Sequence, residues 1–125
     1  MFPGVYDTLS AKIAERVGFP LAFISGYAVS ATLIGEPDMG LLTQTEIIDR
    51  ARRICRAVAI PIIVDADTGY GDALNVVPTV GELIEAGAAV NTGNELGATP
   101  LWLAAINGSH LMAGQLLAAG ADPNA

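Results

Sequence analysis

The chain has 125 residues, of which 52% are hydrophobic and only 15% are charged, and its formal net charge at pH 7 is −7. This length allows one modest domain or two small units. Either it is an alanine-rich helical protein or it exposes apolar surface that favours self-association or a partner. All six cations lie in the first 56 residues, and seven acidic residues follow them. Such a surface repels phosphate backbones and anionic lipid, so we expect no nucleic-acid or membrane binding.

Cysteine content and the N-terminal sequence bound the class of protein further. Cys55 is the single cysteine, which excludes a disulfide within the chain and a cysteine-rich metal site. Its apolar neighbours in a helical pattern indicate a buried thiol. The start, MFPGVYDTLS, has neither the basic residues nor the apolar run of a signal peptide, and no stretch has the length of a membrane-spanning helix. We therefore expect a cytoplasmic, soluble protein.

The first 40 residues predict a helix, a strand and a loop. Leu9, Ile13 and Val17 are spaced by four, which predicts a helix that Asp7 caps and Gly18 ends. The apolar run FPLAFISG (19–26) predicts a buried strand. The following YAVSATLIGEPDMG (27–40) ends in glycine, proline and aspartate, and predicts a long loop with room for one turn of helix.

A second set of elements comes next. TQTEIIDRARRICRAVA (43–59) opens with a capping box, Thr43 and Glu46, and predicts a helix. Its predicted apolar face comprises Ile47, Ala51, Ile54 and Val58. IPIIVDADTGYGD (60–72) predicts a second buried strand that runs into a glycine-rich acidic loop, and a helix is expected from about Pro78 to Ala86. Alternating strands and helices predict parallel βα units with right-handed crossovers.

The last third of the chain predicts a helical hairpin. Thr99 followed by Pro100 is a helix start, and Asn107 and Gly108 mark its end. Ser109 is expected to cap the second helix, which ends at Gly120. His110, the single histidine, falls at the start of that helix, where a surface or capping role is expected rather than catalysis or zinc binding.

This hairpin belongs to a repeat. GELIEAGAAVNT (81–92) matches GQLLAAGADPNA (114–125) in outline, so that Gly87 and Asn91 each recur 33 residues later. A 33-residue period with the pattern G-x-TPL-x-x-AA between the copies is the ankyrin spacing. Residues 87–125 therefore resemble one ankyrin repeat preceded by the tail of another. Trp102 departs from the pattern, because ankyrin repeats usually carry histidine there.

Residues 1–88 resemble a different family, the isocitrate lyase and phosphoenolpyruvate mutase enzymes. The motifs are PGVYDTLSAKIAERVGFP, SGYAVSA, GEPDMGLLT and DADTGYGDALNVV. The resemblance implies a (β/α)8 barrel that uses Mg²⁺ to make or break bonds next to a carboxylated enolate. It reaches only from the first strand through the third helix. We therefore predict a chimera joined inside ELIEAGAA (82–89): a truncated barrel piece with two or three parallel strands (1–88), then an ankyrin-like helical hairpin (89–125).

Two carboxylates form the strongest candidate site. Asp65 and Asp67 follow a predicted strand, and in an extended chain both side chains point to the same side. Two hard oxygen ligands at the carboxyl end of a strand suit Mg²⁺ with several bound waters. The structural alternative is an acidic turn with Thr68, Gly69 and Gly71 at its bends.

The resemblance implies roles for specific residues. Asp65 and Asp67 match the metal-holding pair, and Asp38 matches an active-site acid. The segment that cradles the substrate carboxylate corresponds to Ser25, Gly26 and Tyr27. Two departures weaken the case for catalysis: Phe23 stands where many relatives have tyrosine, and Pro78 is expected to break or restart a helix.

We therefore predict a non-catalytic hybrid with a scaffold or protein-interaction role. The resemblance places the family's later acidic ligand, its catalytic loop and its distal cations beyond the matched part. One ankyrin repeat cannot bury its own face, and open strand edges invite pairing, so a homo-oligomer and a protein partner at the hairpin are expected. The alternative is a Mg²⁺-dependent lyase or mutase acting on small 2-oxo or 2-hydroxy acids, its site completed by another copy of the chain.

Overall fold

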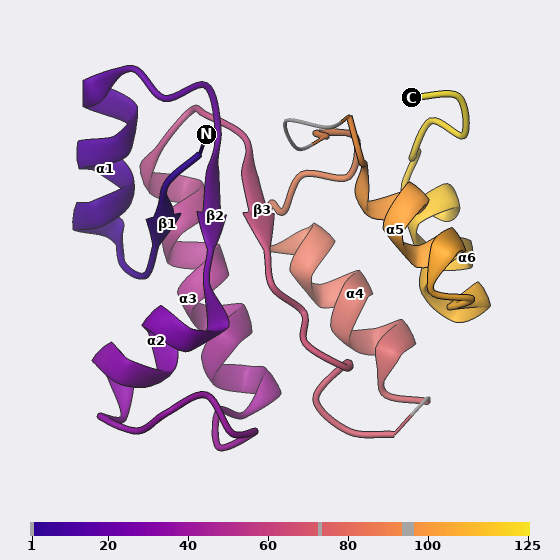
Figure 1. The fold of residues 1–125 in the computed structure, drawn as a ribbon, viewed down its shortest axis with the longest axis horizontal. Helices are drawn as coiled ribbons and strands as arrows, with labels where there is room; N and C mark the ends of the chain where they lie inside the picture. The colour runs from indigo at the N-terminus through magenta and orange to yellow at the C-terminus, as the bar shows by residue number, and fades with distance from the viewer. Residues whose placement is uncertain (1, 73, 94–96) are drawn as a thin grey trace.

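A three-stranded parallel sheet organises the first part of the molecule. The computed structural model describes residues 2–72, 74–93 and 97–125. Strands β1 (Gly4–Val5), β2 (Ala22–Ile24) and β3 (Ile62–Val64) pair in the order β1-β2-β3. Helix α4 lies between this sheet and the α5–α6 pair, which forms the C-terminal end of the molecule (Figure 1). The predicted fold class, a parallel βα piece followed by a helical hairpin, is confirmed.

Helix α1 (Thr8–Val17) begins and ends where the sequence predicts. The Asp7 carboxylate accepts a hydrogen bond from the Ser10 N–H at 2.7 Å, and Gly18 ends the helix with a φ of 98°. The apolar stripe that predicts the helix does not face the core. Leu9, Ile13 and Val17 are 65%, 54% and 69% exposed, whereas the buried residues of α1 are alanines. Small side chains let α1 approach the sheet closely and leave the larger ones on the surface.

Helix α2 (Gly26–Leu33) corrects the predicted loop over residues 27–40. The chain is helical for eight residues here, and the irregular stretch begins only after Leu33. The Ser25 hydroxyl accepts a bond from the Ala28 N–H at 3.4 Å, which caps the helix start. Ser30 is fully buried and its hydroxyl donates to the Glu36 carbonyl at 2.8 Å. The sequence of α2 lacks the charged residues and the strong amphipathic pattern that usually predict a helix. The hydrogen bonds of these two serines help to stabilise it instead.

Helix α3 (Gln44–Ala57) has the predicted capping box. The Glu46 carboxylate accepts from the Thr43 N–H at 2.8 Å, and the Glu46 N–H donates to the Thr43 hydroxyl at 3.3 Å. Ile47 and Ile54 are fully buried. The helix ends at Ala57, so Val58 lies just beyond it in extended backbone and packs against the core from there.

Helix α4 (Val76–Glu85) starts two residues before the predicted Pro78. The prediction that this proline breaks the helix is wrong, because Pro78 lies in the first turn, where its missing N–H removes no intrahelical bond. The next residue, Thr79, is fully buried. Its hydroxyl donates to the Gly69 carbonyl at 2.8 Å and accepts from the Gln44 amide at 2.9 Å. These two bonds join α4 to the loop after β3 and to the start of α3.

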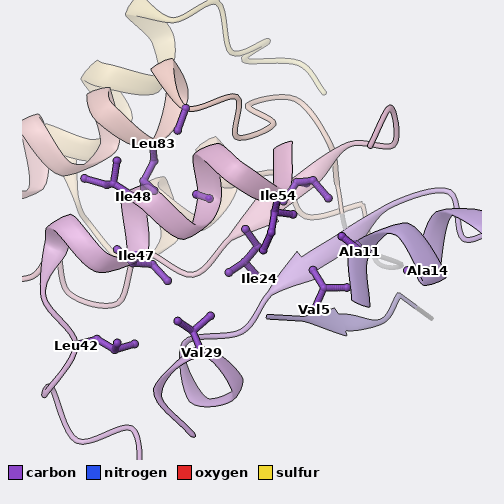
Figure 2. Close-up of a cluster of buried hydrophobic side chains, with 14 residues drawn as sticks. Val5, Ala11, Ala14, Ile24, Val29, Leu42, Ile47, Ile48, Ile54 and Leu83 are labelled. Carbon is purple, nitrogen blue, oxygen red and sulfur yellow. The ribbon is translucent and has the colours of Figure 1, made fainter. Parts of the chain in front are cut away.

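Two hydrophobic clusters meet at α4. The first lies between the strands and the helices that cover them, and Figure 2 shows Ile24 of the sheet beside Ile54 of α3, with Leu83 of α4 in the same cluster. The second cluster joins the adjoining part of the apolar face of α4 to α5 (Pro100–Ile106) and α6 (His110–Ala118). Its buried members are Val76, Val80, Leu101, Ala104, Leu116 and Ala121. The hairpin therefore packs on a helix of the barrel-like part.

The segment after α4 contacts both parts of the chain. The Ala89 N–H donates to the Ile62 carbonyl at 2.8 Å, so the chain begins to run along the outer edge of β3. Two residues later the Asn91 side chain donates to the Gly120 carbonyl at 3.1 Å and accepts from the Asp122 N–H at 2.7 Å. These bonds connect the two repeated turns that the 33-residue period predicts.

The caps of the hairpin follow the prediction at α5 and depart from it at α6. The Thr99 hydroxyl accepts from the Trp102 N–H at 3.2 Å, with Pro100 at the first helical position. Ser109 is the N-cap residue of α6 as predicted, but its side chain makes no capping bond. Instead, the Ala113 N–H donates to the Ser109 carbonyl, the ordinary first bond of a helix.

Candidate carboxylate site and adjoining cavity

The predicted site residues gather where β2 and β3 end. The closest approach is at Gly26, the first residue of α2. A Cβ atom at this position would lie 3.0 Å from Oδ2 of Asp38 and 3.4 Å from Oδ2 of Asp65. Both carboxylates therefore rest against the same glycine, and the structure brings together three residues that are far apart in the sequence. The absence of a side chain at Gly26 leaves them this room.

Asp65 and Asp67 form a tight turn. The Asp67 N–H donates to Oδ1 of Asp65 at 3.0 Å, and Asp67 has a φ of 46°. The backbone is therefore not extended at Asp67 as the prediction assumed, although Asp65 and Asp67 both line one cavity. Asp65 is half-buried beside β3, whereas Asp67 is exposed. The pair thus offers one enclosed and one solvent-facing carboxylate.

The three residues from Ser25 to Tyr27 lie in different surroundings. Gly26 is buried against the carboxylates, and Ser25 uses its hydroxyl to cap α2. The Tyr27 side chain is exposed on the surface of the helix. The backbone of Gly26 therefore lies beside the Asp38 and Asp65 carboxylates, and the Tyr27 ring does not.

Tyr70 is a site residue that the sequence patterns did not identify. It is half-buried and has a φ of 58°, which is uncommon for a bulky side chain and marks a strained turn. Burial raises the pKa of Tyr70, and the negative charges of Asp65, Asp67 and Asp38 raise it further. Its hydroxyl therefore stays protonated at neutral pH and can donate a hydrogen bond. The sequence feature that could have identified Tyr70 is its place between two glycines in DTGYG, directly after the acidic pair.

A cavity of about 510 Å³ adjoins Asp65, and we name it the β3–α5 cavity. Its walls come from β2, β3, the acidic loop, the start of α4 and the helical hairpin. Its lining residues include Phe23, Ile63, Asp65, Asp67, Leu103 and Met112. The Phe23 ring, where relatives often have tyrosine, also meets the Phe2 ring edge-on, with centroids 6.3 Å apart.

The carboxylates suit a hard cation. Carboxylate oxygens are the ligands that Mg²⁺ prefers, and Mg²⁺ is commonly held by one or two of them with waters completing its shell. Asp65 and Asp67 provide such a donor pair. Within the described ranges no group of three or more histidine, cysteine, aspartate or glutamate side chains is arranged to hold a metal ion. The donor chemistry therefore fits Mg²⁺ only as a water-rich site.

Two other residues singled out from the sequence lie away from this chemistry. Cys55 is half-buried in α3, and burial raises the pKa of its thiol, so it is a weak nucleophile at neutral pH. His110 is exposed at the start of α6. None of the helices in the described ranges has the length and apolar character needed to cross a membrane.

Comparison with known proteins identifies both parts of the chain. The phosphoenolpyruvate phosphomutase family matches residues 1–94, and the ankyrin repeat matches residues 96–125. The chloroplastic carboxyvinyl-carboxyphosphonate phosphorylmutase of Arabidopsis thaliana is 57% identical over 90 residues. These residues cover 71% of this chain and 26% of the relative, so the chain spans about a quarter of that protein's length.

Solved structures agree with this assignment. Phosphoenolpyruvate phosphomutase from Streptomyces platensis subsp. rosaceus has a TM-score of 0.67 at 41% identity, over 70% of this chain and 30% of that one. A phosphonopyruvate hydrolase has a TM-score of 0.72 at 31% identity and covers 98% of this chain and 44% of its own. Because this second match covers 98% of the chain, it includes the hairpin. The phosphonopyruvate hydrolase therefore has part of its own structure at the position of the hairpin. The protein belongs, through residues 1–94, to the phosphoenolpyruvate phosphomutase family, and it continues into an ankyrin repeat.

Proposed function

We propose that the protein is a non-catalytic hybrid in which the barrel-derived part (1–88) supports an ankyrin-type hairpin (89–125) as a protein-interaction surface. The observation that carries this proposal is the second hydrophobic cluster. Val76 and Val80 of α4 pack against Leu101 and Leu116 of the hairpin, so α4 acts as the helix of a preceding repeat. A single repeat cannot bury its own face, and α4 supplies the missing neighbour.

The outer side of the hairpin is available for contact. Large apolar side chains stay on the surface there, with Trp102 50%, Ile106 61% and Leu117 48% exposed. Ankyrin repeats cover such surfaces by stacking or by binding partners. Aromatic anchors such as Trp102 contribute strongly to protein interfaces. A partner with an apolar surface is therefore the expected ligand of this face.

We propose further that the chain self-associates. The exposed stripe on α1 and the outer edge of β1, whose strand pairs only with β2 among the described residues, leave apolar and hydrogen-bonding surface uncovered. Sedimentation velocity over a hundredfold range of protein concentration tests this. The wild type should shift from monomer to a larger species as concentration rises. A monomer at every concentration would exclude the homo-oligomer.

Variants then separate the two surfaces. Replacing Trp102 and Ile106 with glutamine should weaken assembly if the hairpin is the interface, whereas replacing Leu9 and Ile13 with glutamine should weaken it if the exposed stripe on α1 is the interface. Both pairs consist of exposed apolar side chains on helices, so each controls for the general effect of added polarity. Assembly that depends only on the α1 pair would assign the contact to the barrel-derived part instead.

A second candidate function rests on the approach of Asp38 and Asp65 to Gly26. In this alternative the chain is a Mg²⁺-dependent lyase or mutase for small 2-oxo or 2-hydroxy acids, completed by another copy. Asp65 and Asp67 would hold the ion, and the backbone at Gly26 would face the substrate. When bound, Mg²⁺ would neutralise the charge of an enolate. Asp38 lies near enough to the same glycine to exchange a proton in this site.

Calorimetric titration with Mg²⁺ tests the second candidate. Saturable binding that disappears in an Asp65→Asn, Asp67→Asn variant, together with turnover of phosphonopyruvate or oxaloacetate, would establish the lyase or mutase alternative and overturn the non-catalytic proposal. A folded protein that neither binds Mg²⁺ nor turns over these acids supports the scaffold role. The matched control is Glu85→Gln, which removes an exposed charge on α4 outside the site.

A further inference from the structure

We propose that the β3–α5 cavity binds an organic ammonium ligand with an apolar body, its charged end beside Asp65 and Asp67. This inference goes beyond the scaffold role and does not depend on it. The cavity arises from the way the two parts of the chain meet. The hairpin packs on α4 rather than on the sheet, so the face of the sheet at Phe23 and Ile63 remains partly uncovered.

The walls of the cavity suit an apolar body of moderate size. Phe23 and Ile63 are register partners on neighbouring strands, so their side chains lie next to each other on one face. Leu103 of α5 and Met112 of α6 close the opposite side. The volume of about 510 Å³ lies within the range of roughly 300–1,000 Å³ that small-molecule sites occupy. Met112 adds a flexible side chain that adapts to different shapes.

The charge at one end of the cavity selects the ligand. Asp65 and Asp67 line it, and no lysine or arginine is among the lining residues; none follows Arg56 anywhere in the sequence. A carboxylate or phosphate ligand would meet unbalanced negative charge there. An ammonium group is attracted instead.

The geometry also favours an ammonium ligand over a bare metal ion. The half-buried Asp65 carboxylate lies next to the apolar walls of the cavity. Charge interactions are stronger there than in water. The Phe23 ring in the same cavity can stabilise a cation through its π face. A hydrated Mg²⁺ ion would use the carboxylates but none of the apolar surface. A ligand that uses both is an alkyl or aryl ammonium compound.

Three matched probes test the proposal on the full chain. They are 2-phenylethylammonium, the neutral 2-phenylethanol and the anion 3-phenylpropionate, titrated by calorimetry at pH 7 with backbone amide NMR shifts to locate binding. The ammonium compound should bind about tenfold more tightly than the alcohol, because a half-buried carboxylate adds a favourable charge interaction. The anion should not bind. The shifted amides should include those of the acidic loop and of α5.

Two variants test separately how the Asp65 charge and the apolar walls contribute to ligand affinity. Asp65→Asn should remove most of the preference for the ammonium compound over the alcohol, and Leu103→Trp should weaken both by filling the cavity. Glu85→Gln should change neither affinity. Equal binding of ammonium and alcohol to the wild type, no binding of the ammonium compound below about 10 mM, or equal losses in Asp65→Asn and Glu85→Gln would each overturn the proposal. The wild-type comparison needs no variant, and sedimentation of the same samples reports on the scaffold role separately.

Discussion

Substitution of Gly87 by alanine tests the close contact between α3 and the end of α4 most directly. Gly87 ends α4 with a φ of 107°, and a Cβ atom there would lie 2.9 Å from the Cβ of Cys55 on α3. The left-handed backbone alone costs a residue with a side chain about 1–2 kcal/mol. Moving α3 and α4 apart by several tenths of an ångström adds about 1–2 kcal/mol of lost packing. We expect Gly87→Ala to lower the free energy of unfolding by about 2–4 kcal/mol.

Two glycines of the hairpin supply matched controls for this experiment. Gly108 also has a positive φ, 67°, but a Cβ atom there meets nothing within 4 Å, so Gly108→Ala reports the backbone cost alone. Gly114 lies inside α6 with the same free space, and Gly114→Ala should stabilise by about 0.5–1 kcal/mol. Urea unfolding followed by circular dichroism measures all three. If Gly87→Ala loses no more than Gly108→Ala, the close contact between α3 and α4 is refuted.

Three further changes test other contacts. Thr79→Val should cost about 1–3 kcal/mol in urea unfolding because it leaves the buried Gly69 carbonyl and the half-buried Gln44 amide without their bonds. Thr32→Val, at an exposed site, should cost less than about 0.5 kcal/mol; equal losses would contradict the bonds of Thr79. Asn91→Ala should speed amide exchange at Asp122, and unchanged exchange would argue against their bond. Cys55 should react with iodoacetamide more slowly than the same thiol in urea, because burial raises its pKa; equal rates at pH 8 would contradict that burial.

Local chemistry made some of these elements predictable. The ends of α1 and α3 follow from capping residues, Asp7 and Thr43, whose short side chains reach backbone N–H groups of the next turn. Such signals act over three or four residues and are therefore visible in sequence. Strands β2 and β3 followed from short apolar runs, and the family motifs predicted two or three parallel strands. Prediction succeeded where the determining contacts lie close together along the chain.

The errors came from tertiary contacts. Residues after Ser25 are small and uncharged, and α2 forms because Ser30 and Val29 find buried positions under the following loop. Pro78 is tolerated because α4 begins earlier, with Thr79 bonded to groups from two distant segments. Asp67 is a local exception, because its N–H is held by Asp65 two residues away, as in the acidic turn that the sequence left as the alternative. None of these bonds could be deduced from periodicity.

The site shows the same limit. The motifs identified Asp38, Asp65 and Gly26 as candidates, and their contact depends on neighbouring strands ending at one edge of the sheet. Tyr70 escaped notice because its role depends on the charges around it rather than on its spacing. The β3–α5 cavity was not predictable at all, because it depends on which helix the hairpin packs against.

The two families can share a chain because the broad apolar face of α4 packs against two different partners. Leu83 and Ala86 are buried in the cluster under the sheet, and Val76 and Val80 are buried against the hairpin. In a barrel helix the part of this face that carries Val76 and Val80 would meet a neighbouring helix, and an ankyrin hairpin offers a surface of the same kind. The Ala89 N–H then bonds β3 as a next strand would. A helix whose apolar face extends beyond the sheet accepts either neighbour, which explains why the exchange occurs just after α4 and not within a strand.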